Sequence, residues 1–183
     1  MTRRWRHLFH QEGVAFLNGL RFFTRIRIPD QLPHSAALLQ RATPYLPAIG
    51  LLVGSISALT FCLAQSVLPQ SVSVLLAMST ALYVTGGFHE DGLSDTADGL
   101  GGGWDKDQIL TIMKDSRVGS YGVIAVVMVL LIKFASLDEI PTTWVPVLLI
   151  AGHAFSRYCA ILIMGSLDYV RDDASSKSRE LTT

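Results

Sequence analysis

Charged residues are scarce in this sequence, and one long stretch has none at all. Only 16% of its 183 residues are charged, whereas ordinary soluble domains carry roughly 25%. Residues 42–88 contain no Asp, Glu, Lys or Arg, and half of all residues are hydrophobic. Long apolar runs between blocks of charge are typical of a multi-pass membrane protein rather than of a soluble core. The formal net charge is zero, so the composition does not indicate binding to nucleic acid.

Other absences exclude further classes of site. The two cysteines, Cys62 and Cys159, lie in apolar segments without the spacing of a metal or redox site, so we expect free, buried thiols. The sequence offers no HExxH pair of nitrogen ligands for zinc. The glycines at 101–103 are not followed by the Lys-Ser/Thr of a P-loop, and they predict a flexible break or a plain loop. No small-residue cleavage site follows an uninterrupted apolar core, so we predict no removable signal peptide.

The apolar segments predict an all-α membrane bundle of four spanning helices, since a span needs about 20 residues. The predicted spans are residues 46–66, 71–88, 118–137 and 143–165. Gly50 and Gly54 have the GxxxG spacing that permits close contact between helices. Thirteen of the fifteen basic residues fall on one side of these spans. By the positive-inside rule this side, with the N-terminus, faces the cytoplasm of a cell inner membrane.

Residues 14–28 predict an amphipathic helix ahead of the first span. Phe16, Leu20 and Phe23 share one face, and Arg21 and Arg25 lie on another. A basic amphipathic helix in the membrane interface fits this pattern, and a solvated helix packed on a core is the alternative. Pro29 and Pro33 are expected to end the helix.

The most informative stretch follows the uncharged one. If residues 88–99 continue the second span as a helix, Asp91, Asp95 and Asp98 occupy positions i, i+4 and i+7 on one face. Unpaired carboxylates at this spacing repel one another, and a divalent cation would remove the repulsion. Ligands that are all oxygen favour Mg²⁺ or Mn²⁺. A solvated loop without function is the alternative.

A second charged stretch begins the third span. A short amphipathic helix around residues 109–113 is expected to deliver Lys114, Asp115, Ser116 and Arg117 to this place. Arg117 is suited to neutralise a diphosphate, and Asp115 would serve as a fourth metal ligand or orient Arg117. A salt bridge beside the membrane is the alternative. Asp105 and Asp107 are off the helical register, and we expect them to be solvated.

Three further residues are candidates from their position. Arg157 lies halfway along the fourth span, where an unpaired charge is costly, so we expect a polar cavity below the metal site. Lys133, near the outer end of the third span, is expected to reach the interface. His89 would assist proton transfer or contact substrate. Metal, arginine and lysine together suit phosphoryl or nucleotidyl transfer at the cytoplasmic face.

Two motifs carry a resemblance to a known family. HEDGLSDTADG at residues 89–99, followed by KDSRVGSYG at residues 114–122, resembles the membrane enzymes called cobalamin synthases, or adenosylcobinamide-GDP ribazoletransferases. Their pattern is H-x-D-G-L-x-D-x-x-D-G and then K/R-D-S-R-x-G-x-x-G. This sequence matches the pattern at every specified position, and Glu90 falls at a variable one. The resemblance extends from about residue 14 to the end, as one transferase domain. Members of the family are about a third longer, so we expect the chain to lack their C-terminal helices.

The resemblance implies the last joining step of cobalamin assembly. Phosphocobinamide would pass from adenosylcobinamide-GDP to α-ribazole or its 5′-phosphate, with Mg²⁺ required and GMP released. Catalysis is expected from His89, Lys114, Asp115 and Arg117, metal binding from Asp91, Asp95 and Asp98, and substrate binding from Ser116, Gly119 and Arg157. The expected partners are these small molecules, membrane lipid, and a second copy of the chain or other corrinoid-assembly enzymes.

Two alternatives remain at the level of sequence. DTADG at residues 95–99 also fits the start of the CDP-alcohol phosphotransferase motif, but Leu100 stands where that family continues with Ala-Arg. A divalent-cation transporter would need acidic or amide residues in the middle of several spans, and the second span has none before Glu90. Release of nucleotide would distinguish a transferase from a transporter.

Overall fold

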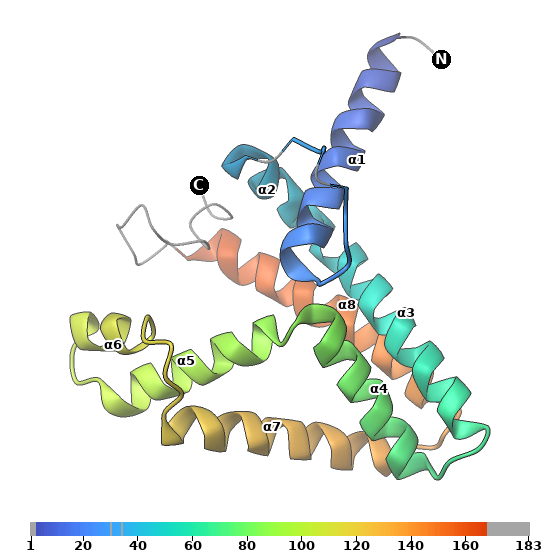
Figure 1. Cartoon of the computed structure of the whole chain (residues 1–183), viewed down its shortest axis with the longest axis vertical. Helices are drawn as coiled ribbons and strands as arrows, with labels where there is room; N and C mark the ends of the chain where they lie inside the picture. The colour runs from blue at the N-terminus through green and yellow to red at the C-terminus, as the bar shows by residue number, and fades with distance from the viewer. Residues whose placement is uncertain (1–2, 30, 34, 168–183) are drawn as a thin grey trace. The chain divides into compact units, whose positions relative to one another are not determined.

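The computed structural model shows an all-α protein, as the sequence predicts. The structure describes residues 3–29, 31–33 and 35–167, and no strand occurs among them (Figure 1). The elements are α1 (Arg3–Phe23), α2 (Ala36–Ala42), the 3-10 helix η1 (Thr43–Tyr45), α3 (Leu46–Gln65), α4 (Gln70–Thr85), α5 (Phe88–Gly102), α6 (Lys106–Ile112), α7 (Ser120–Asp138) and α8 (Val145–Ser166).

Three of the four predicted spans are confirmed. Among the described residues, three helical segments are long and apolar enough to cross a membrane: Ala37–Gln65, Ser120–Asp138 and Val145–Ser166. The remaining predicted span, residues 71–88, is wrong in its C-terminal bound, because α4 is a 16-residue helix that ends at Thr85. At 1.5 Å per residue such a helix rises about 24 Å, less than the roughly 30 Å of a bilayer core. It qualifies as a span only together with α5.

The second span does not continue straight into α5, because α4 and α5 are separated by a bend of 86°. Gly86 and Gly87 adopt φ angles of 68° and 70°, a left-handed conformation that is strained for any residue with a Cβ. The backbone N–H of Gly86 donates to the carbonyls of Leu82 and Tyr83 and so closes the end of α4. Residues 88–102 then form a new helix in a different direction.

The N-terminal helix α1 ends five residues earlier than predicted, at Phe23 rather than residue 28. Thr24 ends it, because its hydroxyl donates to the carbonyl of Leu20 at 2.6 Å and accepts from the N–H of Ile26 at 3.2 Å. The predicted faces are present: Leu20 and Phe23 are buried, and Arg21 is exposed. This helix contacts α2 and η1.

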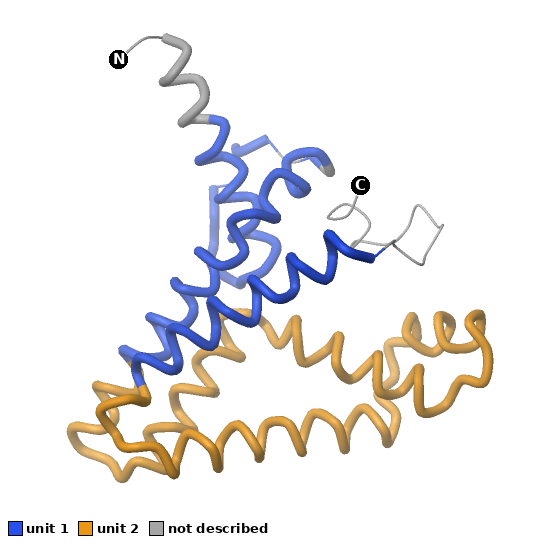
Figure 2. Tube along the Cα trace, turned by 180° about the vertical axis from the view of Figure 1, so that it is seen from behind, with its two compact units in different colours: residues 1–59, 146–183 blue, residues 60–145 orange. Residues whose placement is uncertain are grey.

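The chain divides into two compact units, coloured separately in Figure 2. Unit 1 comprises residues 1–59 and 146–183. Within it, α3 and α8 pack closely at the predicted GxxxG pair. A Cβ on Gly50 would collide with the carbonyl oxygen of His153, and one on Gly54 would lie 2.7 Å from the Cα of Ile150. Only glycine permits this approach.

Unit 2 comprises residues 60–145, and within it α7 is fastened at both ends. Near its C-terminal end, the side-chain amide of Gln70 donates to the carbonyls of Asp138 at 2.7 Å and Ile140 at 2.8 Å. Thr142 donates its hydroxyl to the Gln70 amide oxygen. These bonds join the start of α4 to the end of α7, and α5 packs against the beginning of α7 (Figure 2).

The cysteine prediction is half right. Both thiols are free, but Cys62 is exposed and Cys159 is only half-buried. Apolar segments of a membrane protein can turn such side chains outward, because lipid accepts apolar surface that water would not.

Candidate functional site

The helix α5 carries the acidic motif and keeps the predicted register, because residues 88–102 are helical throughout. The three aspartates differ in exposure along this helix. Asp91 is exposed, Asp95 is half-buried, and Asp98 is 8% exposed. Ser94, one turn before Asp98, is also buried. The motif therefore runs from open surface into the contact between α5 and α7.

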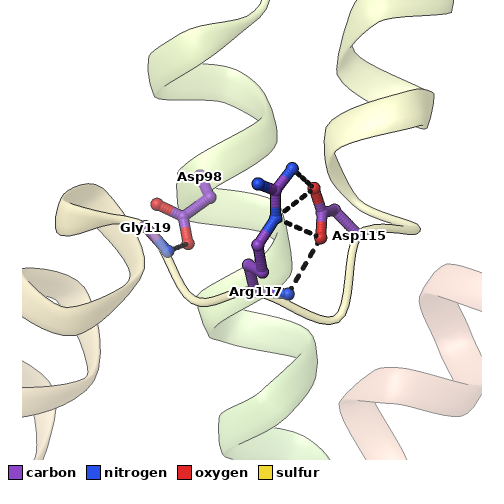
Figure 3. Close-up of polar contacts among 4 residues, drawn as sticks. All are labelled: Asp98, Asp115, Arg117 and Gly119. Atoms are coloured by element: carbon purple, nitrogen blue, oxygen red, sulfur yellow. Dashed lines mark hydrogen bonds and ion pairs between the residues drawn. The ribbon is translucent and has the colours of Figure 1, made fainter.

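Asp98 joins the two sequence motifs. One of its carboxylate oxygens accepts a hydrogen bond from the backbone N–H of Gly119 at 2.7 Å, and the other accepts from that of Gly122 at 2.8 Å (Figure 3 shows the first). Gly119 is the N-cap residue of α7, and it has no side chain to provide a cap. The carboxylate of Asp98 thus satisfies amides at the positive end of the α7 dipole.

Glycines make this contact possible. A Cβ on Gly119 would collide with an Asp98 carboxylate oxygen, and a Cβ on Gly122 would collide with the hydroxyl oxygen of Ser94. The predicted break at residues 101–103 is wrong for its first two glycines, because α5 continues to Gly102. Gly101 instead lies against the ring of Tyr121, which a Cβ on this glycine would approach to 2.5 Å. These glycines permit close packing of α5 on α7.

The connection from α6 to α7 carries the second motif. The predicted amphipathic helix is α6, and Asp105, which we expected to be merely solvated, is its N-cap residue and accepts from the N–H of Gln108 at 2.9 Å. After α6, Lys114 and Ser116 are exposed. The sequence signal for the cap was available, because Asp is among the preferred N-cap residues.

Asp115 and Arg117 form a forked ion pair (Figure 3). The Nε of Arg117 donates to both Asp115 oxygens at 3.1 and 3.0 Å, and its Nη2 donates to Oδ2 at 2.6 Å. The side-chain hydrogen bonds from Arg117 lower the pKa of Asp115 from 3.8 to about 2, and the same pairing raises the pKa of Arg117. Asp115 therefore stays ionised and orients Arg117, which is one of the two roles expected for it.

The remaining predicted residues lie in different places. His89 is exposed at the start of α5, and its ring stands edge-on to that of Phe88 at 5.5 Å between centroids. Lys133 is half-buried in α7. Arg157 lies in α8 of unit 1 and is 4% exposed, with Nη1 donating to the carbonyl of His153 at 2.9 Å. The polar cavity predicted around Arg157 stays a prediction.

The fit of the acidic helix to a metal ion depends on which of its carboxylate oxygens are open. Among the described residues, no group of three or more His, Cys, Asp or Glu side chains is placed to hold an ion. The two oxygens of Asp98 are engaged by amides, whereas Asp91 is exposed. Protein Mg²⁺ sites often use one or two carboxylates and complete the shell with water and substrate phosphates. The donor set of α5 fits a site of this kind, with exposed Asp91 and half-buried Asp95, one helical turn apart, as the carboxylates that would hold the ion.

Two features of the site escaped the sequence reasoning. The bend that separates α5 from α4 was missed, although the Gly86-Gly87 dipeptide is a turn signal. The anchoring role of Asp98 was missed because a carboxylate that caps a helix 21 residues further along the chain leaves no local pattern.

Known proteins of one family are similar to this chain. The family model described as cobalamin-5-phosphate synthase matches residues 15–182. Three relatives, each named adenosylcobinamide-GDP ribazoletransferase, come from Shewanella species. That of Shewanella woodyi is 48% identical over 178 residues, which cover 96% of this chain and 69% of the relative. That of Shewanella amazonensis is 48% identical over 176 residues, 94% of this chain and 68% of the relative.

The relative from Shewanella oneidensis is 47% identical over 180 residues, covering 96% of this chain and 68% of the relative. No solved structure matches the chain. The family match includes both motifs that Asp98 joins, and it favours the transferase interpretation over the lipid enzyme and the transporter. The chain therefore belongs to the family of cobalamin-assembly enzymes described as cobalamin-5-phosphate synthase.

Proposed function

We propose that this chain transfers phosphocobinamide from adenosylcobinamide-GDP to α-ribazole or its 5′-phosphate and releases GMP. In this reaction a ribazole hydroxyl oxygen forms a bond to the phosphorus next to cobinamide. The bond between this phosphorus and the bridging oxygen of the diphosphate breaks, and GMP leaves with that oxygen while the hydroxyl proton goes to solvent or a base. The relatives that carry the name of this reaction support the substrates.

One structural observation supports placing the reaction at α5 and the α6–α7 connection. The acidic motif and the KDSR motif are separate in sequence, but Asp98 fastens the first to Gly119 and Gly122 of the second. A diphosphate substrate requires both kinds of group: carboxylates that bind a cation, and a fixed arginine that pairs directly with the phosphate oxygens.

The residues of this chain would divide the work as follows. Asp91 and Asp95 would hold Mg²⁺ together with the diphosphate, and the ion would neutralise charge on the leaving phosphate. Arg117 is held by Asp115 and is 88% exposed at its side chain, so its remaining donors are open to a substrate. Lys114 and Ser116, exposed on the same connection, would bind further phosphate oxygens. His89 would contact the acceptor or take its proton.

We further propose the orientation and setting that the charge distribution favours. The N-terminus, α5 and α6 would face the cytoplasm at the inner membrane, because thirteen of fifteen basic residues belong to this side. Lipid surrounds the spans in this proposal, since apolar side chains such as Ile124, Leu131 and Ile132 of α7 are exposed. A second copy of the chain or another corrinoid-assembly enzyme would be the protein partner.

The test is GMP release from adenosylcobinamide-GDP and α-ribazole by membranes that carry this chain, with and without Mg²⁺. We expect release only with Mg²⁺, and we expect Asp95→Asn to lower the rate by a factor of about 100 or more. Asp107→Asn is the matched control, because Asp107 is an exposed acid on α6 outside both motifs. Mg²⁺-dependent release that Asp95→Asn retains in full would refute the proposed site.

A further inference from the structure

A cleft lined by three arginines lies where α1 ends. It is an open cleft of about 500 Å³, and we call it the arginine cleft, with the lining residues Arg21, Thr24, Arg25, Ile26, Arg27 and Ile28. We propose that the arginine cleft binds a phosphate group, carried either by a lipid headgroup or by a soluble phosphate compound. This site is independent of the transfer reaction proposed above, and its test measures binding.

The cleft is built by the local structure around Thr24. Thr24 is 8% exposed, and its hydroxyl donates to Leu20 and accepts from the N–H of Ile26. These bonds stop the helix and hold the next residues beside its last turn. The arginines before and after Thr24 consequently line one space. Its volume lies within the roughly 300–1,000 Å³ of small-molecule sites.

One acid, Asp30, follows this arginine-rich stretch directly. Residues 13–29 contain three arginines and no Asp or Glu. The nearest acid before them, Glu12, is occupied by other partners: it accepts from the Tyr45 hydroxyl at 2.6 Å and from Arg41 at 3.1 Å. Those two bonds lower the pKa of Glu12, so it remains an anion paired elsewhere.

Arg25 and Arg27 are exposed, and within the described part of the chain neither forms an ion pair with an acid. Guanidinium groups bind phosphate oxygens through two parallel hydrogen bonds. Basic pockets of membrane proteins hold lipid phosphates with several such groups, and the arginine cleft has this arrangement at the start of a membrane domain. The same arrangement suits the diphosphate or monophosphate of a soluble nucleotide.

The experiment has one arm for each source of phosphate. In the first arm, inorganic pyrophosphate is titrated calorimetrically into the full chain in a zwitterionic detergent. In the second arm, the chain is placed in nanodiscs of phosphatidylcholine with a minor fraction of phosphatidylglycerol, and native mass spectrometry measures the retained anionic lipid. Arg25→Gln and Arg27→Gln are compared with Arg41→Gln, which removes the same charge from an arginine of unit 1 outside the cleft.

We expect each cleft variant to weaken binding about tenfold in one arm, because a charged hydrogen bond is lost. We expect Arg41→Gln to change it less than about twofold. Weakening confined to pyrophosphate identifies a soluble ligand, and weakening confined to phosphatidylglycerol identifies a lipid. Circular dichroism checks the fold of both variants, since Arg25 and Arg27 both lie after the end of α1. If Arg25→Gln is misfolded, Arg27→Gln decides. Wild-type binding in both arms by the cleft variants, or no binding by the wild type, would overturn the proposal.

Discussion

Asp98 offers the sharpest test of how the site is built. If it anchors α7, Asp98→Asn should loosen the start of that helix. The carboxylate accepts two amide hydrogen bonds at 2.7 and 2.8 Å. Asn keeps a single acceptor oxygen and turns a donor toward the other amide, so one charged bond is lost and a buried amide is left without an acceptor. The cost is about 2–3 kcal/mol.

This cost predicts two measurable changes. The amides of Gly119 and Gly122 should exchange with deuterium about 30- to 150-fold faster, since each 1.4 kcal/mol is tenfold in an opening equilibrium. The midpoint of thermal unfolding in detergent should fall by about 5–10 °C. Hydrogen exchange with mass spectrometry, read on peptides covering residues 117–124, resolves the first change.

Asp91→Asn is the matched control on the same helix, because Asp91 is exposed. It should lower GMP release, as a proposed ligand of Mg²⁺, while leaving exchange at the start of α7 as in the wild type. Unchanged exchange at Gly119 and Gly122 in Asp98→Asn would refute the anchoring argument. Loss of transfer with unchanged exchange would assign Asp98 to the metal instead.

Two more predictions concern packing and charge. Gly50→Ala should lower the unfolding midpoint in detergent, because its Cβ would collide with the His153 carbonyl and push α3 from α8 at a cost of about 1–3 kcal/mol. The control is Gly152→Ala, whose Cβ would have nothing within 4 Å. This variant should leave the unfolding midpoint unchanged or raise it. The pKa of Asp115 falls from 3.8 to about 2 on pairing with Arg117, so the stabilisation is present above about pH 4 and is lost as pH falls toward 2. An unfolding difference between wild type and Asp115→Asn that is the same at about pH 2 and pH 6 would contradict this.

The local pattern of the sequence was enough for much of this protein. Mostly apolar runs of about 20 residues predicted α3, α7 and α8 to within two residues, because a spanning helix satisfies its own backbone and needs mainly apolar side chains. The spacing of Gly50 and Gly54 predicted the close packing found in unit 1, since a GxxxG pair lies on one face of a helix. The acidic and KDSR motifs also identified the family, because their residue types and order are themselves the signal.

Contacts between distant residues decided the rest, because no local rule reports them. In the sequence, Asp98 is one of three equivalent carboxylates. Only the contact with α7 makes it the anchor of that helix, whereas Asp91 stays exposed. The Gly86-Gly87 pair is a turn signal in the sequence, but only the structure shows its left-handed backbone and the bend of 86° between α4 and α5. The sequence alone determined the three long apolar helices and the family. Tertiary structure decided which carboxylates are open to a ligand, because burial and backbone hydrogen bonding depend on neighbours that the chain brings from elsewhere.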